Sequence, residues 1–178
     1  MLYYKMLSKS LKTVMIRRPS GIIAGLTAAW AIFGLFLAVD SQLNVPPGTF
    51  YKTVGLVFGI SSAYAMYVGF LLFMVTAIII SIIYNYISKR IRIFHISSMP
   101  KGIGTGIFAG VIVWGVLFLP IHYYVIQPAL SSMANAGSLD SSVANQLIQL
   151  SDTVIIGSLA LHMLFGGVMG FCSRLAAI

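Results

Sequence analysis

The chain has 178 residues; 59% of them are hydrophobic, 8% are charged, and the mean hydropathy is +0.98. Because an ordinary soluble domain carries roughly 25% charged residues, these values exclude a water-soluble globule. Eleven Lys and Arg stand against three aspartates and no glutamate, for a net charge of +8. The basic residues flank long apolar runs, so we attribute them to membrane orientation and anionic lipid, and we expect no nucleic-acid partner.

The first 18 residues predict an amphipathic helix that lies in the inner headgroup layer of a membrane. Apolar side chains recur there at intervals of three and four residues, and lysines occupy the opposite face. A helix that binds a partner protein is the alternative interpretation. The cations expected to contact lipid headgroups in this segment are Lys5, Lys9, Lys12, Arg17 and Arg18.

Four apolar runs are long enough to cross a hydrocarbon core about 30 Å thick, which takes ~20 helical residues. They cover residues 21–39, 54–81, 103–125 and 154–172. We expect the second helix to extend to about residue 92, where further headgroup contacts come from Lys89, Arg90 and Arg92. The predicted fold is an all-α integral membrane protein, with residues 1–178 forming a single four-transmembrane-helix bundle.

The distribution of cations between the loops predicts how this bundle is oriented. Five cations precede the first run, four lie between the second and third runs, and Arg174 follows the fourth, whereas only Lys52 lies on the other side. By the positive-inside rule, both termini are predicted to be cytoplasmic in a multi-pass protein of the cell membrane. An even number of spans agrees with that arrangement.

Two segments are predicted to connect spans on the outer side. The first contains Val45-Pro46-Pro47-Gly48, which cannot continue a helix and therefore predicts a tight reversal. The second, residues 129–152, is longer and rich in Ser, Asn and Gln. Within it, the spacing of Val143, Leu147 and Ile148 predicts a short amphipathic helix.

Residues 19–37 match residues 100–118 at several small residues. The identities are Pro19/Pro100, Gly21/Gly102, Ile22/Ile103, Gly25/Gly106, Ala28/Ala109 and Gly34/Gly115. Both segments start on the same predicted side, so they indicate two duplicated helical hairpins related by an axis along the membrane normal. The competing explanation is that two glycine-rich apolar helices have identical residues at some positions by chance.

Small residues recur four apart in every predicted span. Such stripes let helix backbones approach closely where lipid offers no hydrophobic drive for association. We expect helix packing at Gly21, Gly25, Gly55, Gly59, Gly102, Gly106, Gly110, Gly166 and Gly170. Two interpretations stay open: at least one groove receives a helix of another chain, or all grooves are used within the bundle.

The predicted spans hold few groups capable of chemistry. No Asp, Glu, Lys or Arg lies within the limits of any predicted span, which argues against a proton relay or a charged selectivity ring. The sequence also lacks a phosphate-binding glycine loop, paired cysteines and a His-Glu-x-x-His motif. We therefore expect that the chain is no enzyme on its own, although it could be a subunit of one.

Two histidines are the candidate metal ligands. His162 lies inside the fourth run, and His122 follows Pro120 near the outer end of the third. With an α-helical period, His122 falls on the same face as Gly104 and Gly115. Copper would suit imidazole together with thioether and carboxylate groups, and haem is a second cofactor that histidine ligates. The alternative is that each histidine hydrogen-bonds a neighbouring helix and no cofactor is bound.

Aromatic residues are predicted to divide between the core and the membrane interface. Trp30, Trp114 and Tyr67 lie in mid-span and are expected to fill the core. Tyr51 lies near the end of a span and fits an interfacial belt. Pro120 is expected to kink the third span and to free a backbone carbonyl.

Two segments carry a resemblance to known membrane proteins. The runs GIGTGIFAGVIVWGVLFLPIHYYVIQP (102–128) and GSLALHMLFGGVMG (157–170) resemble a pattern of small YagU-like four-helix membrane proteins of undefined function. The isoleucine-rich, glutamate-free composition is also similar to that of accessory subunits of archaeal membrane monooxygenases, such as the ammonia monooxygenase assembly. The chain lacks the Asp-x-x-x-His copper-ligand arrangement of that family's catalytic membrane subunit, so this resemblance implies an auxiliary chain.

The leading functional hypothesis is a non-catalytic accessory subunit that packs beside other integral membrane subunits of a complex. It follows from abundant packing grooves and scarce intramembrane chemistry. One alternative is a small binding or transport module with a metal or solute site near His122 and His162. The other is a homo-oligomeric pore.

Overall fold

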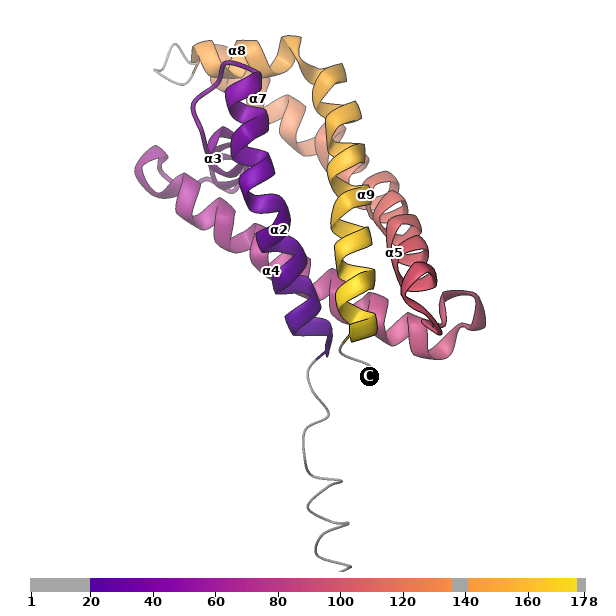
Figure 1. The fold of residues 1–178 in the computed structure, drawn as a ribbon. Helices are drawn as coiled ribbons and strands as arrows, with labels where there is room; N and C mark the ends of the chain where they lie inside the picture. The colour runs from indigo at the N-terminus through magenta and orange to yellow at the C-terminus, as the bar shows by residue number, and fades with distance from the viewer. Residues whose placement is uncertain (1–19, 136–140, 176–178) are drawn as a thin grey trace, which may run out of the picture.

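The computed structural model describes residues 20–135 and 141–175, which form helices and no strands (Figure 1). Four helices are long and apolar enough to cross a membrane: Gly21–Gln42, Ser62–Arg90, Met99–Asn135 and Ser151–Leu175. The predicted all-helical architecture with four apolar helices is therefore confirmed. The predicted interfacial helix, with its five cations, lies outside the described residues.

The first long helix, α2 (Ser20–Gln42), is followed directly by a chain reversal. Asn44 and Gly48 adopt positive φ angles of 56° and 89°, and Pro46 and Pro47 lie between them. Glycine reaches this region without the steric cost that a Cβ atom brings. The reversal predicted from the two prolines is found where it was expected.

The second predicted span, residues 54–81, is divided in the structure. A short helix, α3 (Thr49–Val57), ends before a turn, and α4 (Ser62–Arg90) begins after it. Gly59 lies in that turn with a φ angle of +76°. Because no charge or proline interrupts the apolar run, its hydropathy did not predict the turn between α3 and α4. The expected extension beyond residue 81 is present, since α4 continues to Arg90.

The third long apolar helix contains two π-helical turns. It comprises α5 (Met99–Val113), a π turn (Trp114–Phe118), α6 (Leu119–Ile121), a second π turn (His122–Ile126) and α7 (Gln127–Asn135). Pro120 lies between the two π turns. Proline donates no N–H and crowds the carbonyl group four residues earlier, and a π turn accommodates such a defect by i→i+5 hydrogen bonding. Pro120 therefore coincides with two local changes of helical pitch.

Two further helices follow α7. α8 (Ser141–Gln149) lies in the predicted outer segment and confirms the short helix expected there. α9 (Ser151–Leu175) is the fourth long helix and extends a few residues beyond the predicted limits of 154 and 172 at both ends. Figure 1 shows α7 and α8 at the end of the bundle opposite the C-terminus. We call these two ends the α8 end and the C-terminal end.

The long helices pack as antiparallel neighbours. α5 lies along α9, α2 lies between α4 and α9, and α3 folds back onto α4 (Figure 1). Gly21 and Gly25 of α2 face α4, and their matched residues in the internal repeat, Gly102 and Gly106 of α5, face α9. Matched positions of the repeat thus make equivalent contacts within two helix pairs.

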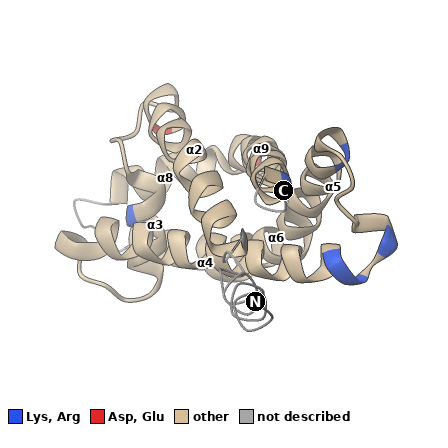
Figure 2. Cartoon of the chain, turned by 60° about the horizontal axis from the view of Figure 1, so that its bottom comes forward, with Lys and Arg blue, Asp and Glu red and all other residues tan. Residues whose placement is uncertain are grey.

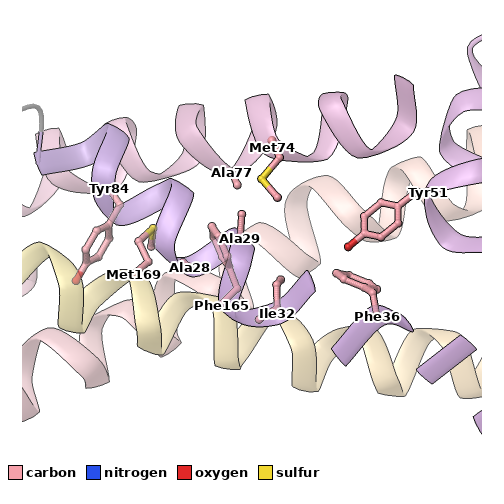
Figure 3. Close-up of a cluster of buried hydrophobic side chains, with 10 residues drawn as sticks. All are labelled: Ala28, Ala29, Ile32, Phe36, Tyr51, Met74, Ala77, Tyr84, Phe165 and Met169. Carbon is pink, nitrogen blue, oxygen red and sulfur yellow. The ribbon is translucent and has the colours of Figure 1, made fainter. Parts of the chain in front are cut away.

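A cluster of buried apolar side chains joins α2, α3, α4 and α9 (Figure 3). Tyr51 of α3 is only 1% exposed, and its ring centroid lies 5.8 Å from that of Phe33, 5.7 Å from Phe36 and 5.5 Å from Phe70. The prediction that Tyr51 belongs to an interfacial belt is wrong, because α3 turns back into the bundle. Trp30, predicted to fill the core, is instead 59% exposed.

Charged residues of the described chain separate between the two ends of the bundle, and Figure 2 marks them in blue and red along the ribbon. Basic residues of the described chain gather at the C-terminal end, around the connection from α4 to α5 and at the end of α9: Lys89, Arg90, Arg92, Lys101 and Arg174. Asp40 in the last turn of α2, Lys52 in α3 and Asp152 in the first turn of α9 lie toward the α8 end. The C-terminal end therefore has a net positive charge and the α8 end a net negative one. This difference is relevant to the orientation of the chain in a membrane.

Candidate functional site

A cavity of about 330 Å³ lies at the α8 end between α2, α3, the His122 π turn and α9. We call it the distal cavity. Its wall is mainly apolar, with Phe36, Phe50 and Leu161 among the lining residues. The polar side chains that line it are Asp40, Gln42, Thr53, His122, Thr153 and Ser158. Ligand cavities of about 300–1,000 Å³ with a few placed polar groups are typical of small-molecule sites between the helices of bundles.

Asp40 holds the start of α3 against the end of α2. The carboxylate is buried at 4% exposure, and the Gly48 N–H donates to its Oδ2 atom at 2.8 Å. The backbone N–H groups of Thr49 and Phe50 also interact with this carboxylate. Unpaired N–H groups and the helix dipole make a helix start favourable for negative charge. Asp40 is thus a capping group that also lines the distal cavity.

Tyr51, next to this helix start, contributes a buried phenol. Its hydroxyl has no hydrogen-bond partner in the structure. Burial and the negative charge of Asp40 both raise the pKa of Tyr51 above its usual value. The phenol therefore stays neutral at physiological pH and serves the aromatic cluster rather than acid–base chemistry.

His122 belongs to a buried polar network. It is 2% exposed, and its Nε2 atom lies 3.0 Å from the Ser151 hydroxyl and 3.1 Å from the Gln127 amide nitrogen. Gln127 Nε2 also donates to Ser151 Oγ at 2.8 Å. The Phe118 ring stacks on the imidazole at 5.5 Å. His122 Nδ1 is buried and has no hydrogen-bond partner among the described residues.

The π turns explain why the sequence did not predict this network. In an α-helix, residues five apart point in different directions, so His122 and Gln127 were not expected to meet. The wider π turn His122–Ile126 brings them together. For the same reason the predicted shared face is wrong: Gly104 and Gly115 have nothing within 4 Å of an added Cβ, whereas His122 is buried.

His162 lies beside a second cavity rather than in the distal one. Its Nδ1 atom donates to the Ser158 carbonyl at 2.7 Å, which fixes that nitrogen as the protonated one. The second cavity, of about 280 Å³, is lined by His162 and by residues of α2, α4, α5 and α9. We call it the central cavity. The Phe118 ring lies 5.4 Å from the imidazole of His162 and 5.5 Å from that of His122.

The geometry does not favour the proposed metal or haem site. Among residues 20–135 and 141–175, no group of three or more His, Cys, Asp or Glu side chains could hold a metal ion. His122 and His162 line different cavities, and both use a ring nitrogen for hydrogen bonds to the chain. His122 contacts Ser151 of α9 and so matches the alternative expectation of a bond to a neighbouring helix, whereas His162 bonds to Ser158 of its own helix.

Trp114 and Ser158 are site residues that sequence reasoning missed. The indole Nε1–H donates to Ser158 Oγ at 2.9 Å and to the Ile155 carbonyl at 3.3 Å. Ser158 also lines the distal cavity, so the indole is coupled to its wall. The mid-span position of Trp114 predicted a buried side chain, but nothing in the sequence indicated which helix would accept its hydrogen bond.

The predicted packing glycines lie mostly at contacts within the chain. A Cβ added to Gly106 or Gly110 of α5 would overlap a carbonyl oxygen of α9, and one added to Gly166 or Gly170 would overlap α5. Similarly, a Cβ on Gly25 would lie 2.8 Å from the Ala77 carbonyl of α4. The described helices use these surfaces for each other.

The remaining predicted packing glycines fall into two groups. Gly21 and Gly102 lie against other helices of the chain, with Ile82 and Gly170 as neighbours, and Gly55 meets the Ala65 backbone across the α3–α4 turn. The prediction that Gly59 is a packing glycine is wrong. It has open space around it and a positive φ angle, because it forms the turn that interrupts the predicted helix.

Of the predicted headgroup contacts, three lie in the described part of the chain. Lys89 and Arg90 end α4, and Arg92 follows in a short 3₁₀ turn (Arg92–Phe94). The Arg90 guanidinium lies 5.1 Å from the Tyr86 ring centroid, a cation–π contact that joins a basic group to an aromatic side chain. Lys5, Lys9, Lys12, Arg17 and Arg18 lie outside the described residues.

Comparison with known proteins gave no match to a protein-family model, to a curated protein or to a solved structure.

Proposed function

We propose that this chain is a membrane-embedded binding module that holds a small lipophilic molecule in the distal cavity, without catalysing a reaction by itself. The observation that carries the proposal is the cavity's composition: an apolar space of about 330 Å³ with two buried polar residues, Asp40 and His122, in its wall. Burying a carboxylate and an imidazole is costly in an apolar surrounding unless they are hydrogen-bonded. Both are so bonded here, and both line the cavity.

The surroundings of the chain decide which interactions would select a ligand. A molecule that enters from lipid gains little from the hydrophobic effect, because lipid tails are already apolar. Selectivity would then come from shape and from hydrogen bonds to the cavity wall. Asp40 and His122 supply those hydrogen bonds in this proposal.

Fluorescence of Trp114 tests binding directly, since its indole is bonded to Ser158 of the cavity wall. The chain has two tryptophans, so Trp30→Phe leaves Trp114 as the only reporter. In lipid nanodiscs, titration with 10-bromodecan-1-ol should quench it in two parts: a saturable part from the cavity and a linear part from the bilayer. A linear response alone would contradict the proposal.

A matched pair of variants controls this experiment. Gly157 lines the distal cavity and has no atom within 4 Å of an added Cβ, so Gly157→Leu should fill the space without a clash. Gly104 is equally uncrowded but lies on the exposed face of α5. Gly157→Leu should remove the saturable quenching, and Gly104→Leu should keep it.

The proposal includes an orientation in the cell membrane. The basic residues at the C-terminal end support placing that end, with both termini, in the cytoplasm, by the positive-inside rule. The same cations would then meet the anionic lipids of the inner leaflet. The distal cavity would open toward the outer half of the bilayer.

A role as accessory subunit is the second candidate, and one residue favours it. Trp30 lies in the middle of α2 and is 59% exposed, although tryptophan prefers the membrane interface to the hydrocarbon core. A neighbouring membrane subunit would cover it. Native mass spectrometry of the protein extracted in mild detergent tests this: co-purification of another membrane chain that is lost in Trp30→Ala supports it, and a monomer free of partners contradicts it.

A further inference from the structure

We infer that the central cavity is a second binding site, which takes the end of an acyl chain from a phospholipid of the surrounding bilayer. The inference rests on the membrane-embedded state proposed above, but it does not require a ligand in the distal cavity. Two observations carry it: the mouth of the central cavity lies at the middle of two long helices, and its wall offers too few polar groups to hold water.

The central cavity opens on the surface of the bundle at mid-span. Four of its lining residues are exposed: Phe58, Thr76, Leu117 and Ile121. A side chain that lines a cavity and is also exposed marks the mouth of that cavity. Thr76 is the middle residue of α4, and Leu117 is the middle residue of the third long apolar helix. In helices that cross a bilayer, such positions lie near the centre of the hydrocarbon core.

The distal cavity opens at a different depth. Its exposed lining residues are Val39 and Gln42 in the last turn of α2 and Thr153 in the first turn of α9. The ends of membrane-spanning helices lie near the lipid headgroups rather than at the bilayer centre. Both cavities are mainly apolar, so the difference between them is the medium at the mouth. Bilayer hydrocarbon reaches the central cavity directly.

The wall of the central cavity is unsuited to water. Among the described residues that line it, only Thr76 and His162 have polar side chains. Each already donates to a carbonyl group of its own helix, Thr76 Oγ1 to that of Leu72 and His162 Nδ1 to that of Ser158. An ordered water needs two to four polar partners, and an apolar cavity of about 150 Å³ stays dry and binds benzene. The central cavity, of about 280 Å³, therefore suits an apolar occupant.

An acyl chain is the apolar group that a bilayer brings to this mouth. Left empty, the cavity would deprive its lining side chains of dispersion contacts, and hydrocarbon at the mouth can restore them. The chain end reaches the bilayer centre, whereas the ester group stays at the interface. Inside the cavity, the chain end would meet Ile32 of α2 and Phe165 of α9, which are only 3% and 5% exposed. Figure 3 labels both residues among the buried side chains of the core.

Photolabelling of the full chain in lipid nanodiscs tests this site. Two phosphatidylcholine probes are diluted into unlabelled phosphatidylcholine, one with a diazirine at the end of an acyl chain and one with a diazirine beside the ester group. The terminal diazirine should label Ile32 or Phe165 as well as the exposed residues Leu35 and Leu164, which line neither cavity. The ester-proximal diazirine should label neither Ile32 nor Phe165.

Two results would overturn the inference. Terminal labelling confined to the exposed residues Leu35 and Leu164 would show that lipid stays outside the bundle. Equal labelling of Phe165 by both probes would show that the chain does not enter by its end from the bilayer centre.

A tryptophan placed at the mouth provides a matched pair of variants. Thr76 is exposed and lines the central cavity, so Thr76→Trp should obstruct it, whereas Val75 is exposed on the same helix and lines neither cavity. Thr76→Trp should lower terminal labelling of Phe165, relative to that of Leu164, roughly tenfold, which corresponds to about 1.4 kcal/mol. Val75→Trp should preserve the ratio. A ratio that Thr76→Trp leaves unchanged would contradict entry at this mouth.

The outcomes separate this site from the function proposed for the distal cavity. Labelling of Phe165 together with a purely linear quenching of Trp114 by 10-bromodecan-1-ol would support the acyl-chain site and remove the distal one. Saturable quenching with labelling of exposed residues alone would do the reverse. The wild-type comparison of the two phosphatidylcholine probes decides the question even if Thr76→Trp does not fold.

Discussion

Asp40 shows how one side chain can serve both the fold and the site. It lies in the last turn of α2, accepts the Gly48 N–H at the start of α3, and lines the distal cavity. A carboxylate in such a place adds about 0.5–2 kcal/mol of stability as a cap. The start of α3 therefore depends on a residue eight positions before Gly48, which is outside the usual range of a local capping motif.

We expect Asp40→Ala to loosen the start of α3. The change removes the acceptor of the Gly48 N–H, so hydrogen exchange at the amides of residues 48–50 should accelerate, and the free energy of unfolding in mixed micelles should fall by about 0.5–2 kcal/mol. Hydrogen exchange with mass spectrometry measures the first effect. Asp152→Ala is the control, because this exposed aspartate lies in the first turn of α9 and should leave α3 unchanged.

Glycines of α5 provide a second residue-scale prediction. A Cβ at Gly106 would overlap the Gly166 carbonyl of α9, and only separation of the two helices relieves that overlap. Gly106→Ala should therefore lower the free energy of unfolding by about 1–3 kcal/mol. Gly104→Ala meets open space and should lose nothing. Equilibrium unfolding of both variants in mixed micelles would reveal the contrast, and equal stabilities would show that α5 and α9 are not in backbone contact.

At the scale of elements, the third long apolar helix departs most from regular geometry. Its two π turns change the direction in which every later side chain points, and so they bring His122 to Gln127 and Ser151. A π turn is less favourable than an α turn and persists where another interaction holds it, often at functional sites. In this helix the irregular turns coincide with the wall of the candidate site.

Removing the proline should alter this wall. Pro120→Ala restores an N–H and removes the ring that crowds residue 116, so regular α-helical winding becomes available. We expect His122 to rotate away from Ser151 and its Nε2 signal in ¹⁵N-histidine NMR to move toward that of a histidine without this partner. Pro100→Ala is the control, since proline in the first turn of α5 costs no hydrogen bond. An unchanged His122 signal in Pro120→Ala would show that the π turns do not depend on the proline.

For the whole molecule, orientation is the property that composition constrains best. The described cations at the C-terminal end outnumber those at the α8 end, where Lys52 lies with two aspartates. Lysine and arginine near span ends are retained on the cytoplasmic side. The proposed orientation therefore follows from the placement of a few residues.

Single cysteines can test this orientation. In a Cys172→Ser background, Ser132→Cys lies on α7 at the α8 end, and Ser97→Cys lies in the connection between α4 and α5; both positions are exposed. On intact cells, a membrane-impermeant maleimide should label Ser132→Cys at least about tenfold more than Ser97→Cys, which should react only after permeabilisation, because charged reagents do not cross the hydrocarbon core. The reverse pattern would place the C-terminal end outside.

Sequence reasoning succeeded where one physical requirement dominates. Lipid demands long apolar helices, so four of them could be predicted, and prolines marked the reversal after α2. It failed where the chain bends without a polar signal, as at Gly59, and where the helical period changes, as after Trp114. Of the candidate site, His122 was predicted, but Asp40, Gln127 and Ser158 depend on contacts between distant helices that no local pattern encodes.

The backbone contact between α5 and α9 also has a consequence for biosynthesis. Roughly fifty residues of chain separate Gly110 from its partners in α9, and ribosomes add about 5–20 residues per second. The glycine face of α5 is therefore synthesised a few seconds before α9, the helix that covers it. During that interval the glycine face of α5 is open to another helix with small residues, because α9 has not yet been synthesised.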